Sequence, residues 1–179
     1  MDKTYSIGRL DGLTIQARRS VLPALLILWI VLAIMANGLL KLPLAGAVLA
    51  SLAAVFGYYI LGLVHQLGHA WAARRAGYPM EGIRFWGVLS TSYYPADEGN
   101  LPARIHIRRA LGGPFFSLLA FLLLFAAVFL LRGSTGAARW VAIFLCLSDL
   151  LVFLFGALIP LGFTDGSTLL HWLPEREKT

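Results

Sequence analysis

Two histidines, His65 and His69, lie four residues apart within an apolar stretch of the sequence. On a helix this spacing places both imidazole rings on one face, where they can chelate a single metal ion. The same spacing also occurs in histidines that only form hydrogen bonds inside a helical bundle. The apolar surroundings favour metal binding, because ionisable side chains deep in an apolar run are costly and usually functional.

Asp165 is the candidate third ligand. It follows an apolar run that Pro160 and Gly162 interrupt, and it directly precedes Gly166. Two histidines and one carboxylate leave the fourth position of a tetrahedral zinc ion open for water, which is the ligand set of a catalytic zinc site. The sequence therefore predicts Zn²⁺ as the cofactor, with a ligand set of His65, His69 and Asp165.

Four apolar segments must bring these ligands together: residues 21–40, 44–73, 110–131 and 138–163. Each is close to or above the roughly 20 residues that a helix needs to cross about 30 Å of hydrocarbon. The composition agrees, since 59% of the residues are hydrophobic, 13% are charged and the mean hydropathy is +0.76. We therefore predict a single domain over residues 1–179, a membrane all-α bundle of about four transmembrane helices. In this topology the second and fourth helices run parallel, so the three ligands reach the same leaflet.

Two further segments have the pattern of strands. The connection at residues 77–106 alternates in polarity, contains several aromatic residues and is broken by glycine and proline, which is typical of a β-hairpin. The amino-terminal segment, residues 1–20, includes a stretch from Ile7 to Ile15 with the pattern of two strands around a turn. We expect both segments to pair in a small β-sheet at the cytoplasmic face.

The basic residues are distributed unevenly along the chain. Of the fifteen lysines and arginines, four precede the first helix, six lie around the middle connection, and two, Arg176 and Lys178, lie near the carboxyl end. The positive-inside rule then places both termini and the middle connection in the cytoplasm. The net charge of +6 is not gathered in a basic patch interleaved with aromatic residues. The lipid bilayer, and no nucleic acid, is therefore the expected partner.

The other polar residues are expected to have structural roles and not to bind the metal. Asp149 lies about 24 Å from Asp165 along a continuous helix, too far to join the same metal site. A hydrogen-bonded position inside the bundle is favoured for it over a polar relay. The remaining polar residues near the membrane face are expected to contact solvent or lipid headgroups: His106, Arg108, Arg109 and His171.

The segment from His65 to His69, combined with the helix-breaking segment 158–166, resembles the site-2 protease family of intramembrane zinc metalloproteases. The sequence Gly-Gly-Pro-Phe-Phe-Ser at 112–117 is similar to the family's glycine-proline motif, and residues 7–15 are similar to the amino-terminal strand motif of several bacterial and archaeal members. The resemblance implies hydrolysis of a peptide bond within or near the membrane, with a membrane protein or peptide as substrate. It also implies a location in the inner membrane of a prokaryotic cell. The residues it assigns to the substrate cleft are Gly112, Gly113, Pro114, Ser117 and Pro160.

Three positions depart from the family pattern. The glutamate between the two histidines is Gln66, the asparagine three residues before Pro160 is Ala157, and the leucine before the aspartate is Thr164. In the mechanism that the resemblance implies, the glutamate is the general base and later protonates the leaving amine. An amide cannot transfer these protons, so a contribution of about 10² to 10⁴ in rate is lost at this position.

The sequence leaves two accounts of Gln66 open, an engineered knock-out and natural divergence, and Ala157 and Thr164 favour divergence. The chain is therefore predicted to be an inactive or weakly active metallopeptidase scaffold. The alternative function is a pseudoprotease that binds membrane clients or regulates a partner. A haem protein is a third alternative. It would need His106 or His171 nearby, because His65 and His69 share one helical face and cannot supply axial ligands from opposite sides.

Overall fold

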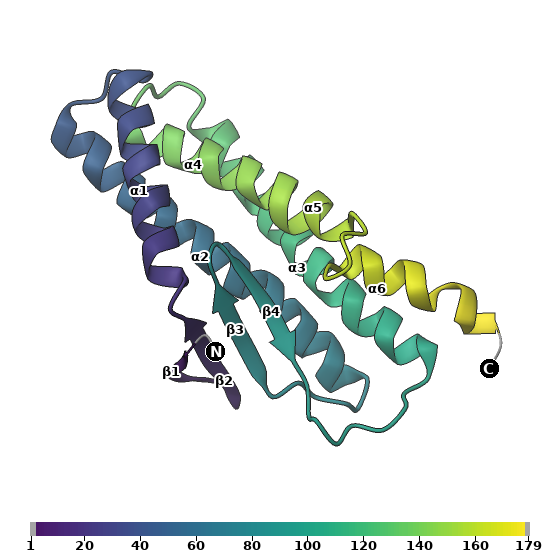
Figure 1. The fold of residues 1–179 in the computed structure, drawn as a ribbon. Coiled ribbons are helices and arrows are strands. Elements are labelled where there is room, and N and C mark those ends of the chain that lie inside the picture. The colour runs from purple at the N-terminus through teal and green to yellow at the C-terminus, as the bar shows by residue number, and fades with distance from the viewer. Residues whose placement is uncertain (1–2, 178–179) are drawn as a thin grey trace.

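Four long apolar helices dominate the fold of this computed structural model, which describes residues 3–177 (Figure 1). They are α1 (Val21–Gly38), α2 (Leu44–Arg75), α3 (Ala103–Leu130) and a fourth helix built from α4 (Ala137–Ser148), the π-helical turn η1 (Asp149–Leu154) and α5 (Phe155–Leu158). Within the described residues, these four are long and apolar enough to cross a membrane. The predicted number of apolar helices is confirmed. Residues 1–2 and 178–179, which include Lys178, lie outside the described range.

Two helix boundaries differ from those predicted. Helix α3 begins at Ala103, not at residue 110, because its first two turns carry arginines and fall outside the apolar window. The fourth helix ends at Leu158, not at residue 163. Ile159 is extended, with φ −73° and ψ 129°, as expected for a residue that precedes a proline.

A four-stranded sheet joins the two strand segments in the order β1-β2-β3-β4. Strands β1 (Thr4–Leu10) and β2 (Leu13–Arg18) are antiparallel, β2 and β3 (Gly82–Trp86) are parallel, and β3 and β4 (Leu89–Tyr93) form an antiparallel hairpin. Asp11 and Gly12 both have positive φ at the first turn, which matches the twist of a two-residue hairpin. The predicted pairing between the amino-terminal segment and the middle connection is confirmed.

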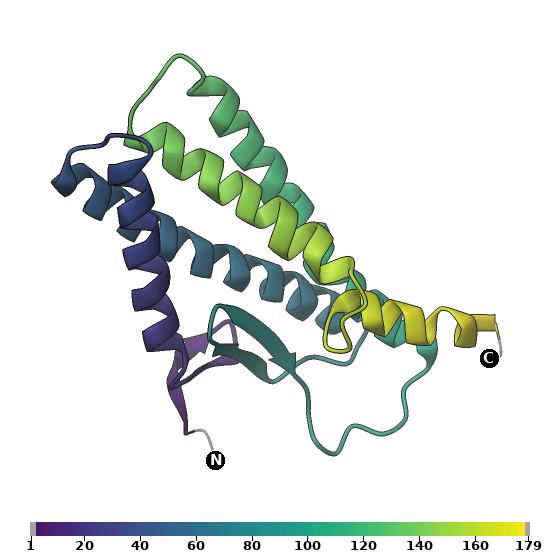
Figure 2. The ribbon, with the colours of Figure 1, turned by 45° about the horizontal axis from the view of Figure 1, so that its top comes forward.

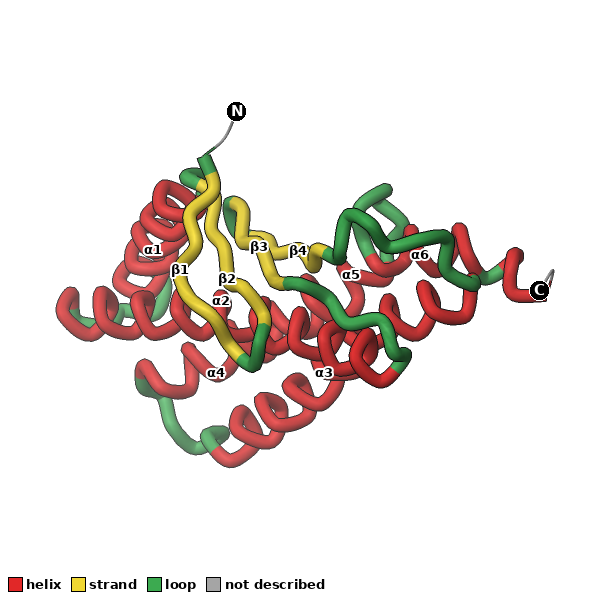
Figure 3. The backbone as a smooth tube through the Cα atoms, turned by 90° about the horizontal axis from the view of Figure 1, so that it is seen from below, coloured by secondary structure: helices red, strands yellow, loops and turns green. Residues whose placement is uncertain are grey.

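Helix α2 is the centre of the molecule, because it contacts α1, α3, α4 and both strands of the β3–β4 hairpin (Figure 2). The sheet packs on α2 through a cluster that includes Leu13, Ile83 and Phe85. Seen from below, the strands lie in one row, and β4 is the strand nearest to α5 and to the short helix α6 (Asp165–Trp172) (Figure 3). The free edge of β4 therefore faces the side of the molecule from which Asp165 comes.

Candidate metal centre

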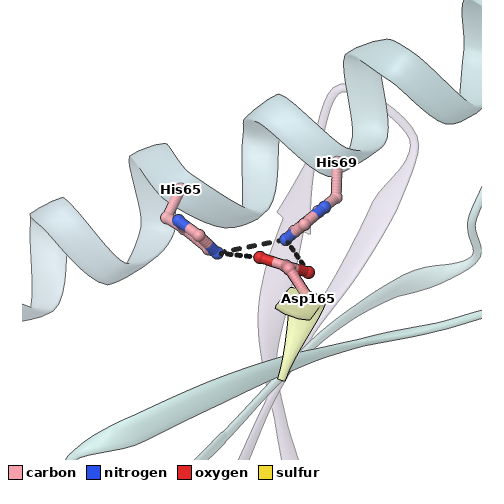
Figure 4. Close-up of side chains that lie close together, drawn as sticks. All are labelled: His65, His69 and Asp165. Carbon is pink, nitrogen blue, oxygen red and sulfur yellow. Dashed lines mark hydrogen bonds and ion pairs between the residues drawn. The ribbon is translucent and has the colours of Figure 1, made fainter. Parts of the chain in front are cut away.

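Three side chains, those of His65, His69 and Asp165, converge between α2 and the start of α6 (Figure 4). The Nε2 atoms of His65 and His69 are 3.1 Å apart. Asp165 places Oδ2 3.2 Å from Nε2 of His65 and Oδ1 3.3 Å from Nε2 of His69. The histidines are 6% and 5% exposed, so the site is buried on the α2 side. The structure thus brings together all three residues that the sequence singled out as ligands.

These separations fit a single zinc ion. Ligand atoms about 2.0 to 2.1 Å from a tetrahedral metal lie roughly 3.3 Å from one another. The shortest distances between the three side chains are 3.1, 3.2 and 3.3 Å, and one ligand atom from each residue can be chosen so that all three lie within 4.8 Å of one another. The donor set of two imidazole nitrogens and a carboxylate is also one that zinc favours in catalytic sites.

The Nδ1 atoms of both histidines are held by partners on α3. Nδ1 of His69 lies 2.8 Å from the main-chain oxygen of Arg109, and Nδ1 of His65 lies 3.0 Å from Oγ of Ser117. The N–H of Gly113 is 3.3 Å from Nδ1 of His69, but a carbonyl oxygen at 2.8 Å can only accept, so we assign the proton to Nδ1. This tautomer leaves the Nε2 lone pair of His69 free to bind a metal.

The glycine-proline segment of α3 lies directly behind the histidines. A Cβ atom at Gly113 would overlap Nε2 of both His65 and His69, and one at Gly112 would overlap the main chain of Gly68. Pro114 and Ser117 are buried in the same stretch of α3. None of these four α3 residues lines the cavity in front of the site, so their assignment to a substrate cleft stays a prediction.

Asp165 is positioned by the loop between α5 and α6. Gly162 has φ +89°, a backbone conformation that favours glycine, and it redirects the chain after Pro160. The hydroxyl of Thr164 accepts from the N–H of Leu161 at 3.2 Å and donates to the carbonyl of Ile159. The threonine that departs from the family pattern therefore ties this loop together. Pro160 lies in the loop and does not line the cavity of the metal site.

The environment of Asp165 favours its ionised form. Burial by itself would raise the pKa of this carboxyl, but the contacts with His65 and His69 outweigh burial and lower the pKa. An ionised carboxylate is the form that binds zinc.

A cavity of about 820 Å³ opens in front of the three ligands. One wall is polar and comes from β4, while the opposite wall is apolar and comes from η1, α5 and the following loop. Residues on the two walls include Ser90, Thr91, Ser92, Leu151, Val152, Phe153, Ala157 and Phe163. The rings of Trp86 and Phe163, which also line the cavity, meet edge to face with centroids 6.1 Å apart.

Gln66 lines the cavity but is turned toward β4. Its Nε2 donates to the carbonyl of Ser90 at 3.1 Å, and its Oε1 accepts from the hydroxyl of Ser92 at 2.6 Å. The amide is 4% exposed. The position where the resemblance expects a general base therefore holds an amide with both of its polar atoms hydrogen-bonded to one strand.

The cavity is also lined by an ion pair between the buried Arg109 and the half-buried Glu98, which the sequence interpretation missed. Arg109 was expected to face solvent or headgroups, but it is 5% exposed and both of its terminal nitrogens contact the carboxylate of Glu98. Its guanidinium also lies over the ring of Tyr94, 4.1 Å from the centroid. The Arg109 guanidinium holds the pKa of the Glu98 carboxyl below its usual range. No spacing signal links these residues, because the loop that carries Glu98 has no regular periodicity.

Asp149 is fully buried at the first position of η1, and no side chain among the described residues donates a hydrogen bond to its carboxylate. It does not line the metal cavity. This agrees with its exclusion from the metal site. The main chain of Phe121 on α3 is a polar neighbour of this carboxyl inside the bundle. His106 stacks on Trp172 with ring centroids 4.2 Å apart, and His171 contacts the same indole.

No protein-family model and no curated protein matches this chain. Among solved structures, the fold is similar to that of the site-2 protease from Methanocaldococcus jannaschii, with a TM-score of 0.67 and 16% sequence identity. The match covers 98% of this chain and 73% of the other. At this identity the similarity shows the fold, and the fold agrees with the family that the sequence motifs resemble.

Proposed function

We propose that this chain is a site-2-protease-like intramembrane zinc metallopeptidase scaffold, and that Gln66 leaves it inactive or weakly active. The observation that carries the proposal is the meeting of His65, His69 and Asp165 at separations of 3.1 to 3.3 Å. The Nδ1 partners on α3, the adjacent cavity and the fold similarity support it further.

We place the four apolar helices across a bilayer, with both termini and the β-sheet on the cytoplasmic side. The proposed location is the inner membrane of a prokaryotic cell. The helices expose large apolar side chains such as Leu123, Leu130 and Ile34, which are 75%, 81% and 66% exposed and would contact lipid. The clustering of cations around the amino terminus and the middle connection supports this orientation.

The chain's own residues suit the binding and hydrolysis of an unwound peptide segment. When bound, zinc would polarise a peptide carbonyl and lower the pKa of a coordinated water to about 7. The free edge of β4 lines the cavity, so an extended segment of a membrane protein or peptide can lie beside it. The apolar wall from η1 and α5 would cover the other side of the segment and exclude bulk water.

The residue at position 66 limits the rate of peptide-bond hydrolysis. A carboxylate there could take a proton from the attacking water and return it to the leaving amine, whereas the Gln66 amide can do neither. A second candidate function is therefore a pseudoprotease that binds membrane clients or regulates a partner. Gln66 and Ala157 are the observations that favour it. The haem alternative has no comparable support, because His65 and His69 direct Nε2 to the same point and His106 packs flat on Trp172.

Binding of a peptidyl hydroxamate tests the proposed function even if the chain cleaves nothing. This ligand chelates a zinc ion that has an open coordination position. We expect the zinc-loaded protein to bind it and Asp165→Ala to lose binding at least a hundredfold. The exposed loop variant Asp97→Ala serves as the matched control and should bind normally. Equal binding by wild type and Asp165→Ala would refute the assignment of the site.

A further inference from the structure

Beside the two histidines, helix α2 carries a second row of residues, a stripe that contacts the β3–β4 hairpin. Tyr59, Gly62 and Gln66 are spaced at i, i+3 and i+7, so they lie along one face of the helix. All three contact the β3–β4 hairpin. The Tyr59 hydroxyl donates to the carbonyl of Gly87 at 2.9 Å, and the Ser90 hydroxyl donates to the carbonyl of Gly62 at 3.4 Å. This stripe docks the hairpin on the helix that carries two of the ligands.

Gln66 makes the most specific contact in the stripe, because it uses both ends of its amide. The carbonyl of Ser90 requires a donor, which the Gln66 NH₂ group supplies at 3.1 Å. The hydroxyl of Ser92 donates to the Gln66 oxygen at 2.6 Å, and it is also hydrogen-bonded to the side chain of Tyr94. The chain of hydrogen bonds thus runs along the polar wall of the cavity.

These contacts replace the partner that an edge strand lacks. Strand β4 pairs with β3 on one side only, and the carbonyl of Ser90 accepts from the Gln66 amide on α2. An ionised glutamate at position 66 would turn an oxygen toward this carbonyl, and methionine would remove the donor to Ser90 and the acceptor for Ser92. The Gln66 amide, which has a donor group and an acceptor, satisfies both groups at once.

We propose that Gln66 is a positioning residue whose amide fastens edge strand β4 to α2. In this role it holds the polar wall of the cavity at a fixed place beside His65 and His69. The proposal goes beyond the metallopeptidase scaffold, because the fastening needs neither a bound metal nor hydrolysis. In this role the contacts that β4 offers to position 66 are complementary to the donor and the acceptor of a glutamine amide.

Hydrogen–deuterium exchange of the membrane-embedded protein tests the proposal locally. We expect the amides of residues 89–93 to exchange about tenfold faster in Gln66→Glu and Gln66→Met than in wild type. Exchange in the middle of α3 should change little. Gln16→Met is the matched control, since the Gln16 side chain accepts a hydrogen bond from Arg84 within the sheet.

A second pair of variants separates fastening from general loosening of the sheet. If the amide acts through Ser92 as well as Ser90, Gln66→Met should accelerate exchange less in a Ser92→Ala background than in wild type. Unchanged exchange of residues 89–93 in both Gln66 variants would overturn the proposal. The same acceleration in Gln16→Met would also overturn it, because the effect would then not depend on contact with α2.

Discussion

The substitution Gln66→Glu tests how much of the expected loss of peptidase activity is caused by position 66 alone. A carboxylate on this turn of α2 would lie on the helix that carries both histidine ligands, and it could act as the general base. General acid–base catalysis contributes about 10² to 10⁴ in rate. We expect cleavage of a membrane substrate to rise about a hundredfold, which corresponds to roughly 2.7 kcal/mol off the barrier.

The structure also predicts that this substitution destabilises the contact between α2 and β4. Glutamate cannot donate to the carbonyl of Ser90, which the Gln66 amide now contacts at 3.1 Å. Leaving a buried acceptor without its donor costs about 1 to 3 kcal/mol. The side chain is thereby released from β4 toward the cavity, while the strand is held less firmly. We therefore expect unchanged zinc content, a higher turnover number and a higher KM for peptide segments that bind beside β4.

The assay uses protein in lipid nanodiscs with a panel of single-span substrates, zinc analysis of each sample and separate determination of kcat and KM. The double variant Gln66→Glu with Ala157→Asn provides the next comparison. Activity in the single variant indicates an enzyme disabled at one position, and activity in the double variant alone indicates a naturally retired protease. Normal zinc content with no cleavage by either variant would refute the base argument and favour the client-binding pseudoprotease.

Three other perturbations test separate parts of the account. Ser117→Ala removes the partner of one histidine Nδ1, so zinc affinity measured by chelator competition should fall about 10- to 100-fold, and an unchanged affinity would contradict the assigned orientation. The pair of Glu98 with Arg109 lowers the carboxyl pKa, so its contribution to stability is present above the unfolded pKa of about 4.3 and is lost as pH falls through the lower folded value. Thermal melts of Glu98→Gln should therefore show less acid dependence than wild type, and equal slopes would refute this contribution. An impermeant thiol reagent added outside cells should label a cysteine near Ser134 and spare cysteines in the 77–106 connection, whereas reversed labelling would place the site on the other side of the membrane.

The elements that could be predicted from the sequence are those with a periodic pattern of residues. Apolar runs marked the four helices, and the spacing of His65 and His69 placed both imidazoles on one face. The strand patterns at residues 7–15 and within 77–106 indicated the small sheet. These predictions succeeded because hydrophobic periodicity and helix geometry are local properties of the chain.

The parts that could not be predicted depend on contacts between distant segments. Nothing near Arg109 in the sequence indicates that this buried guanidinium pairs with Glu98, because the pairing is set by the path of an irregular loop. The hydrogen bonds of Gln66 with Ser90 and Ser92 require the docked position of β4. The sequence motif indicated what Gln66 cannot do, and only the tertiary structure identified what it contacts.

Zinc content of the purified protein tests the central claim most directly. Elemental analysis should find about one zinc per wild-type chain and less than a tenth of that in His65→Ala. His171→Ala, a histidine outside the three-ligand group, should retain full loading. Negligible and equal zinc in wild type and His65→Ala, after purification without chelators and reconstitution with Zn²⁺, would contradict the metal site on which the account rests.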